Sequence, residues 1–293
     1  MSKNHRAGYV NIIGMPNAGK STLMNRLVGE PLAIATAKAQ TTRHRILGMV
    51  NDEQSQIIFS DTPGYLKPSY QLQKKMQAKV EEALEDADVL VLLIDAKHSE
   101  LTEEFAERIK SSSGKLIVAI NKIDLSDQQK LETLVEKVKT EFKPESIIPI
   151  SAIYGANLDQ LLKAIRERLP ESPPYFPKDQ LTDKPEKFFV AEIIREKIFK
   201  LYKQEIPYSC EVKVDSFKED GRLIRIAAII FVNRKSQKPI LIGQNGTAIK
   251  RLGTESRMKI EEFLSSKIFL ELHVKVREHW RENEEQLKNF GYE

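Results

Sequence analysis

Few arrangements of secondary structure can accommodate the stretch GMPNAGKS at residues 14–21. Its spacing is G-x-x-x-x-G-K-S, in which the glycines let backbone amides face phosphates and the lysine neutralises phosphate charge. An apolar run at 9–14 precedes it, and a segment with helical spacing at 21–28 follows it. A strand, a glycine loop and a helix in that order predict a nucleotide-binding α/β domain, with phosphates at the helix N-terminus.

Short apolar runs alternate with amphipathic segments as far as residue 169. Strands are predicted at 9–14, 45–50, 56–61, 89–95, 115–121 and 146–151. Helices are predicted near 21–28, 71–86, 101–112, 127–142 and 157–168. Several of the strands are continuously apolar, as expected when helices cover both faces of a sheet. The pattern predicts an α/β domain with a mostly parallel sheet.

The order of elements changes after a segment rich in proline. Residues 170–187 hold five of the 13 prolines, which suits a linker because proline removes a backbone donor. Beyond it the pattern predicts a helix, two strands, a glycine turn, a second helix and a last strand, which together make a small α+β domain. The predicted divisions are a P-loop domain at 1–170, a linker at 171–187, a second domain at 188–280 and a charged tail helix at 281–293.

The composition fits a globular protein. Hydrophobic residues make up 41% of the chain and charged residues 30%. No apolar run approaches the length of about 20 residues that a membrane helix needs, and the N-terminal residues lack a signal-peptide pattern. The single cysteine, Cys210, excludes an internal disulfide and fits a reducing compartment. We therefore expect a cytoplasmic protein.

Two motifs near strand ends indicate which base is bound. In NKID, Asp124 can accept two hydrogen bonds from guanine, whereas adenine would leave the carboxylate unpaired. Asn121 is expected to brace the neighbouring loop and Lys122 to lie along the base. The stretch SAIYG, from Ser151, supplies the Ala152 amide for the guanine carbonyl.

Two further motifs suit a metal-bound triphosphate. In DTPG, Asp61 is expected to hold magnesium through water, and the Gly64 amide to reach the γ-phosphate. The stretch AQTTRHR lies between the phosphate loop and DTPG, where a threonine must close over the metal. Thr42 is the predicted residue and Thr41 the alternative. The loops that carry these residues would order or collapse with the presence of the γ-phosphate.

These motifs together carry a family resemblance. Residues 9–169 resemble a translation-factor-class GTPase, and the whole chain resembles the Era family of bacterial ribosome-assembly GTPases. The matching stretches are GMPNAGKST, KAQTTRHRILG, SDTPGY, NKID, SAIYG and KPILIGQNGTAIKRLG. The resemblance implies binding of small-subunit ribosomal RNA near its 3′ end, and a peripheral contact with the inner membrane.

The predicted nucleotide site combines the motif residues. Lys20, Thr42 and Gly64 are the predicted catalytic residues, and Ser21, Thr42 and Asp61 the predicted Mg²⁺ site. The residues predicted to bind GTP or GDP are Gly14, Asn17, Ala18, Gly19, Lys20, Ser21, Thr22, Asp61, Gly64, Asn121, Lys122, Asp124, Ser151 and Ala152.

Two residues bear on the rate of hydrolysis. Tyr65 stands where Ras-like enzymes carry a glutamine that positions water, so slow intrinsic hydrolysis is predicted. Asn17 lies in the phosphate loop. In related GTPases an asparagine at this place is associated with a potassium ion, which supplies positive charge where Ras-type enzymes receive an arginine. A simple loop-capping asparagine is the alternative.

A second glycine turn, GQNG at 243–246, lacks the Lys-Ser of a phosphate loop. Between residues 233 and 259 there are seven basic residues and one acid, a local charge of +6. The order of elements around the turn resembles a type-II KH domain, whose G-x-x-G loop clamps a single-stranded RNA backbone. The predicted RNA-binding residues are Ile242, Gly243, Gln244, Asn245, Gly246, Ile249, Lys250 and Arg251.

The sequence as a whole predicts a monomeric, GTP-gated RNA-binding protein of small-subunit assembly. One alternative is a related Era-like GTPase that acts on tRNA or on the large subunit. Two others are a nucleotide kinase, which would have no need of NKID, and a constitutive RNA-binding scaffold with a degenerate GTPase half. The intact nucleotide motifs argue against the scaffold.

Overall fold

The computed structural model describes residues 5–36, 38–221 and 223–292. The ends of the predicted first domain and tail, residues 1–4 and 293, lie outside this range, as do residue 37 in the stretch before AQTTRHR and residue 222 at the start of a predicted strand. The chain divides into two compact units. Unit 1 comprises residues 1–67 and 76–183, and unit 2 comprises residues 68–75 and 184–293.

Unit 1 is built on a six-stranded sheet with the order β2-β3-β1-β4-β5-β6. Its strands are β1 (Arg6–Ile13), β2 (Ile46–Asn51), β3 (Ser55–Asp61), β4 (Val89–Asp95), β5 (Lys115–Asn121) and β6 (Ser146–Pro149). Every pairing is parallel except that of β2 with β3. The predicted, mostly parallel α/β sheet is therefore confirmed.

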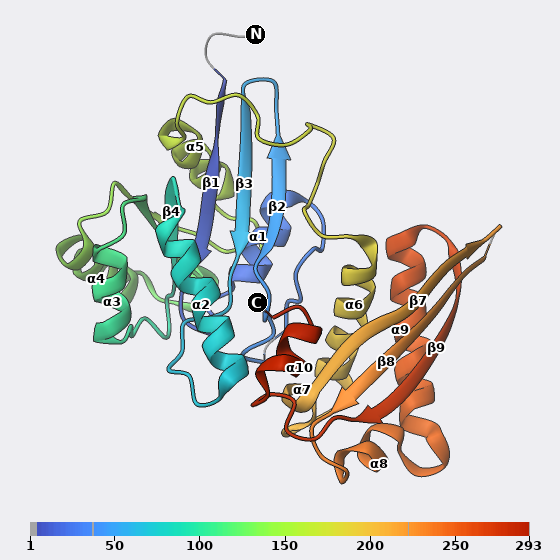
Figure 1. The fold of residues 1–293 in the computed structure, drawn as a ribbon. Helices are drawn as coiled ribbons and strands as arrows, with labels where there is room; N and C mark the ends of the chain where they lie inside the picture. The colour runs from blue at the N-terminus through green and yellow to red at the C-terminus, as the bar shows by residue number, and fades with distance from the viewer. Residues whose placement is uncertain (1–4, 37, 222, 293) are drawn as a thin grey trace. The chain divides into compact units, whose positions relative to one another are not determined.

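Helices lie on both faces of this sheet (Figure 1). They are α1 (Lys20–Val28), α2 (Gln71–Glu85), α3 (Glu103–Lys110), α4 (Gln128–Phe142) and α5 (Leu158–Arg168), with a short 3₁₀ turn at Ile123–Leu125. Because both faces are covered, every residue of β3 and β4 is buried. The carboxyl ends of β1, β3, β4 and β5 meet at one edge, where the motif loops begin.

The proline-rich segment lies along unit 1 as far as Asp183. The Met49 amide donates to the Leu181 carbonyl at 2.8 Å, and the Thr182 hydroxyl donates to the Leu47 carbonyl at 2.7 Å. The Gln56 side chain accepts from the Tyr175 amide at 2.7 Å. This segment thus forms hydrogen bonds with backbone groups of the edge strand β2.

Unit 2 holds a three-stranded sheet with the order β7-β8-β9. Its elements are α6 (Glu186–Leu201), α7 (Ile206–Ser209), β7 (Cys210–Asp220), β8 (Leu223–Val232), α8 (Gln237–Ile242), a 3₁₀ turn at Gln244–Gly246, α9 (Thr247–Leu264), β9 (Lys267–Val276) and α10 (Glu284–Asn289). β7 is antiparallel to β8, and β9 is parallel to it. α6 and α9 pack on the sheet around a core that includes Ile194, Val212 and Ile230. The predicted α+β domain is confirmed.

Two parts of unit 2 were not foreseen. No helix was predicted where α8 lies, and residues 68–75, which include the start of the predicted helix at 71–86, belong to this unit. The Leu72 amide donates to the Arg281 carbonyl at 2.9 Å, and the Arg281 guanidinium lies over the Tyr70 ring. Trp280 is fully buried and donates to the Ser209 carbonyl at 3.1 Å. Among the described residues, no helix has the length and apolar character required to cross a membrane.

Candidate functional site

A pocket of about 1070 Å³ opens at the edge of unit 1 where the motif loops meet. Its lining includes the phosphate loop, residues from the loop before β2, Gly64, the end of β4 and Lys122. It is large enough for a nucleoside triphosphate, since small-molecule sites span about 300–1,000 Å³. Asn17, Ala18, Gly19 and Thr22, which are predicted from their motif to bind the nucleotide, all line this pocket.

The phosphate loop depends on glycine for its shape. Gly19 has a φ of 101°, and a Cβ there would lie 2.3 Å from the Asn121 amide nitrogen. The buried Lys20 ammonium donates to the Gly14 and Met15 carbonyls at 3.1 and 3.0 Å. Burial lowers the pKa of Lys20 to about 8, against the opposing effect of Asp61. A polyanion in the pocket would pair with the ammonium and so offset the cost of burying its charge.

Three predicted metal-site residues converge behind the loop. The Ser21 and Thr42 hydroxyls both donate to Asp61 Oδ2, at 2.7 and 3.0 Å, and lie 2.9 Å from each other. The other oxygen of Asp61, Oδ1, is buried and has no hydrogen-bond partner among the described residues. Burial raises the pKa of Asp61. A hard cation beside Oδ1 would satisfy the orphaned atom and hold the carboxylate ionised, so these residues fit Mg²⁺.

DTPG approaches the phosphate loop closely. A Cβ on Gly64 would lie 2.7 Å from the Pro16 Cα, so only glycine fits. The Tyr65 amide donates to the Gly14 carbonyl at 3.1 Å, whereas the Tyr65 ring is buried and stacks on Phe105. Burial, followed by the Glu104 carboxylate, raises the pKa of Tyr65. The ring therefore belongs to the core of unit 1.

The predicted base-binding residues are braced by side chains. Asn121 donates to the Ala18 carbonyl at 2.8 Å and accepts from the Ala152 amide at 2.9 Å. Thus the Ala152 amide, which was predicted to donate to the guanine carbonyl, donates to the Asn121 side chain in this structure. The Ser151 hydroxyl donates to the exposed Asp124 carboxylate at 2.6 Å and so orients its oxygens.

Sequence reasoning missed one participant, Asp95. The Lys122 ammonium lies 2.6 Å from Asp95 and donates to the Asn17 carbonyl at 2.7 Å. Burial is the largest single effect on Asp95 and opposes its ionisation, but the Lys122 ammonium and the hydrogen bonds from the Lys97 and His98 amides together outweigh it and lower the pKa of Asp95. Its position at the end of the continuously apolar strand β4 was the available signal.

The second glycine turn has a sharply curved backbone. Gly243, Asn245 and Gly246 have φ values of 75°, 51° and 74°. A Cβ on Gly243 would lie 2.9 Å from the Ala248 amide nitrogen, so the α8–α9 turn is as tight as a backbone clamp requires. The Tyr202 hydroxyl donates to the Leu241 carbonyl at 2.7 Å, just before the turn.

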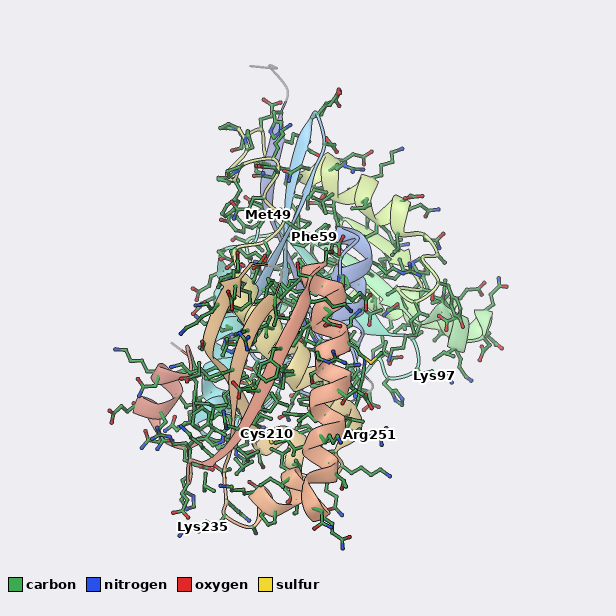
Figure 2. The ribbon with its side chains drawn as sticks, turned by 90° about the vertical axis from the view of Figure 1, so that its right-hand side faces the viewer. Met49, Phe59, Lys97, Cys210, Lys235 and Arg251 are labelled. Carbon is green, nitrogen blue, oxygen red and sulfur yellow. The ribbon has the colours of Figure 1, made fainter. Side chains whose placement is uncertain are left out.

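The predicted RNA-binding residues lie at or beside this turn. Gln244, Asn245, Lys250 and Arg251 are exposed, whereas Ile242, Gly243, Gly246 and Ile249 are partly buried. Arg251 projects from α9 (Figure 2) and pairs with Glu255 at 3.0 Å.

The basic stretch is less positive than its sequence count. Lys235 pairs with Glu278 at 3.5 Å and Lys259 with Glu262 at 3.0 Å, and both acids come from outside the counted range. Lys250, beside the turn, forms no ion pair within the described part of the chain. Arg234 and Lys238, which precede the turn, likewise form no ion pair among the described residues, so the positive charge available to a polyanion flanks the glycine turn on both sides in the sequence.

Comparison with known proteins finds a match for each of the two units. Residues 9–122 match the model of the 50S ribosome-binding GTPase family, and residues 205–281 match the KH domain. The chain is 44% identical to GTPase Era of Geobacter metallireducens, over 100% of both chains. It is 42% identical to a chloroplastic ERA-like GTPase of Arabidopsis thaliana, over 99% of this chain and 69% of the relative.

Two crystal structures have closely similar folds. A variant of Aquifex aeolicus Era bound to GDP and aluminium fluoride superimposes with a TM-score of 0.93 at 39% identity, over 98% of this chain and 99% of the other. Era in complex with MgGDPNP and nucleotides 1506–1542 of 16S ribosomal RNA gives 0.94 at 40% identity, with the same coverage. Since the likeness spans both units and the identity exceeds 40% over the full length of a bacterial relative, this chain belongs to the Era family of GTPases, with a KH domain following its GTPase domain.

Proposed function

We propose that this GTPase binds small-subunit ribosomal RNA near its 3′ end through its KH domain, and that it acts in assembly of the small ribosomal subunit. The observation that carries the proposal is the turn at 243–246, where Gly243, Asn245 and Gly246 have positive φ values and Gln244 and Asn245 are exposed. Lys250 lies beside it and forms no ion pair in the described part of the chain. Such a turn can bring backbone amides close to phosphates. The related Era in complex with 16S ribosomal RNA nucleotides supports the choice of RNA.

In the nucleotide site, Ser21, Thr42 and Asp61 would hold Mg²⁺, with Asp61 acting through water. Bound magnesium would neutralise charge on the β- and γ-phosphates. Lys20 would pair with the outer phosphates, and the Gly64 amide would donate to the γ-phosphate. Asp124, oriented by the Ser151 hydroxyl at 2.6 Å, would accept the two donors of guanine. Asn121 would hold the phosphate loop against the base-binding loops through its bond to Ala18.

We also propose that the bound nucleotide sets RNA affinity. GTP can favour RNA binding only if RNA favours the GTP state by the same factor, so the two affinities must be coupled. The proposal requires RNA affinity to differ between the GTP-analogue and GDP forms. Equal affinities would rule out gating while leaving the RNA site intact.

A potassium ion beside Asn17 is a further part of the proposal. Asn17 is exposed at the pocket and has a φ of 64°, so its side chain is available to a cation or to a loop cap. Faster hydrolysis in potassium than in sodium buffer would support the ion. Equal rates would leave Asn17 as a capping residue.

The test of the RNA proposal is crosslinking in cells followed by sequencing of the recovered RNA. Wild type is compared with the double variant Gln244→Asp and Asn245→Asp, which places two negative charges in the turn. The matched control is Gln128→Asp with Gln129→Asp, an exposed pair on α4 that adds the same charge.

Recovery of the 3′ end of small-subunit ribosomal RNA, lost only in the 244/245 variant, supports the proposal. Recovery of tRNA or large-subunit RNA would instead favour the alternative of a related Era-like GTPase with another target. RNA recovery that neither variant changes would contradict the clamp. Peripheral membrane contact and a monomeric state stay predictions, testable by vesicle sedimentation and light scattering.

A further inference from the structure

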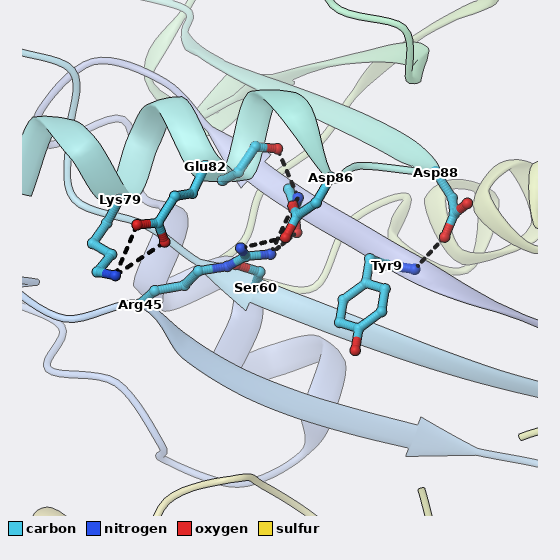
Figure 3. Close-up of polar contacts among 9 residues, drawn as sticks. Tyr9, Arg45, Ser60, Lys79, Glu82, Asp86 and Asp88 are labelled. Carbon is cyan, nitrogen blue, oxygen red and sulfur yellow. Dashed lines mark hydrogen bonds and ion pairs between the residues drawn. The ribbon is translucent and has the colours of Figure 1, made fainter. Parts of the chain in front are cut away.

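The guanidinium of Arg45 joins three elements of unit 1, although the residue itself lies in the loop before β2. Its two terminal nitrogens form a bidentate pair with Asp86, at 2.6 and 3.0 Å, just beyond the end of α2. Its Nε donates to the Ser60 hydroxyl on β3 at 2.7 Å, and one terminal nitrogen donates to Asn11 on β1 at 3.1 Å (Figure 3). The planar fork of arginine suits this fixed set of acceptors.

The acceptors are themselves held in place. Asn11 is fully buried, and its amide donates to both the Ala83 carbonyl and Asp86 at 2.7 Å. The Tyr9 amide donates to Asp88 at 2.8 Å, and the Asp88 amide donates back to the Tyr9 carbonyl at 3.0 Å. The turn between α2 and β4 is thus bonded to β1 on either side of Asp86. Arg45 is therefore anchored to β1, to β3 and to a turn that is itself bonded to β1.

This anchor lies directly beside the metal site. Ser60 precedes Asp61 on β3, and Ile46, which follows Arg45, pairs with Asp61 across the sheet. On the other side of Arg45 the loop carries Thr42, whose hydroxyl lies 3.0 Å from Asp61. Arg45 thereby fixes the point at which the loop joins the sheet, a few residues from the hydroxyl that must meet the metal.

We propose that Arg45 is a positioning residue that holds Thr42 in place for the GTP-bound state. Arg45 does not itself line the nucleotide pocket in the described part of the chain. The inference rests on the proposed role of Thr42 in the metal site. Without the fork, the end of the loop gains freedom, and closure of Thr42 over the metal costs more conformational entropy. GDP, which has no γ-phosphate, needs this closure less.

The experiment measures the affinities of the purified full chain for fluorescent GDP and for a fluorescent non-hydrolysable GTP analogue, both with Mg²⁺. Arg45→Lys keeps the charge but cannot reach Asn11, Ser60 and Asp86 together. This variant is expected to lower the affinity for the GTP analogue about fivefold to tenfold, which is the effect of losing one or two hydrogen bonds. GDP affinity should change less than about twofold. Asp86→Asn, which leaves the rest of the anchor intact, should act in the same direction.

A control and a double variant separate positioning from general destabilisation. Glu82→Gln removes the 2.8 Å ion pair with Lys79 on the same helix (Figure 3) and should change neither affinity. Adding Arg45→Lys to Thr42→Ala should cause no further loss of GTP-analogue affinity, because both act through one hydroxyl.

Equal losses for both nucleotides, or additive losses in the double variant, would overturn the inference. If Thr42→Ala weakens the GTP analogue and Arg45→Lys does not, the role of Arg45 is wrong while the proposed metal site stands. If Thr42→Ala has no effect, both are wrong.

Discussion

The rings of Tyr65 and Phe105 are stacked, with their centroids 4.2 Å apart and their planes inclined by 16°. This contact directs the Tyr65 ring toward the core of unit 1. The position after DTPG therefore offers no side chain that could orient the attacking water. We therefore predict that Tyr65→Phe, which keeps the stack, changes the rate of GTP hydrolysis less than about twofold. The wild-type rate itself should be near that of unassisted Ras, on the order of 10⁻⁴–10⁻³ per second.

A single-turnover phosphate-release assay measures both rates. Lys20→Ala serves as the inactive reference, since it removes the predicted phosphate ligand. Rapid turnover by the wild type, or a large loss in Tyr65→Phe, would show that the phenol takes part in hydrolysis.

Asp124→Asn should change base specificity. The exposed carboxylate accepts from the Ser151 hydroxyl at 2.6 Å through Oδ1, and it is predicted to accept from guanine with its remaining lone pairs. An asparagine offers a donor where guanine also has donors, so GTP affinity should fall at least about 100-fold. Xanthosine triphosphate, which has a carbonyl at that position, should bind better to the variant than to wild type. Competition against fluorescent GDP measures both, and unchanged preference would place the guanine contact elsewhere.

Nucleotide affinity should fall at alkaline pH. Without nucleotide, Lys20 has its pKa lowered to about 8, so above that pH the free protein loses the proton that phosphate binding requires. The bound state raises the pKa again, so binding takes up a proton and weakens with rising pH. Nucleotide affinity is expected to fall about tenfold per pH unit between pH 8 and the pKa that Lys20 has in the bound state.

Fluorescent-nucleotide titrations between pH 7 and 9.5 test this, with unfolding monitored in parallel. Because the unfolded chain binds more protons than the free native protein in that window, the free energy of unfolding of the nucleotide-free protein should rise, by up to about 1.4 kcal/mol per pH unit, while nucleotide affinity falls. Opposite trends in the two quantities are the signature of Lys20. A flat affinity profile would mean that the ammonium is already paired in the free protein.

Tyr202→Phe should weaken RNA binding without affecting GTP binding. The buried hydroxyl donates to the Leu241 carbonyl at 2.7 Å and so supports the end of α8 directly before Gly243. Loss of one buried hydrogen bond of about 1–2 kcal/mol should reduce affinity for a single-stranded RNA carrying the 3′ sequence about fivefold to thirtyfold. Tyr208→Phe, on a half-buried tyrosine of α7, is the control. Equal RNA affinity in the two variants would mean that the turn holds its shape without this bond.

Much of the fold could be predicted from the sequence because the signals are local. The predicted helix at 127–142 differs from α4 by one residue at its start, since Asp127 caps it through the Lys130 amide. β4 was predicted with its observed bounds because a strand buried on both faces reads as a continuous apolar run.

The rest depends on contacts between distant residues. Pro239 lies inside the six-residue helix α8, and the three residues that follow it are all apolar, so no helical periodicity marks the segment. The network of Arg45 joins residues separated by 15, 34 and 41 positions, which one sequence cannot bring together. The direction of the Tyr65 ring was open until Phe105 supplied its partner, because a tyrosine fits either a pocket or a core.

The segment at 171–183 has a consequence for how this protein behaves in solution. An exposed edge strand presents unpaired amides and carbonyls that invite pairing with another chain. Here two such groups on β2 have hydrogen-bond partners in the segment. The Met49 amide donates to the Leu181 carbonyl at 2.8 Å, and the Leu47 carbonyl accepts from the Thr182 hydroxyl at 2.7 Å. A spacer of equal length but of glycine and serine could preserve the reach between the units and still uncover this edge. We therefore expect the natural segment also to limit pairing of this edge with another chain, a role that depends on its composition as well as its length.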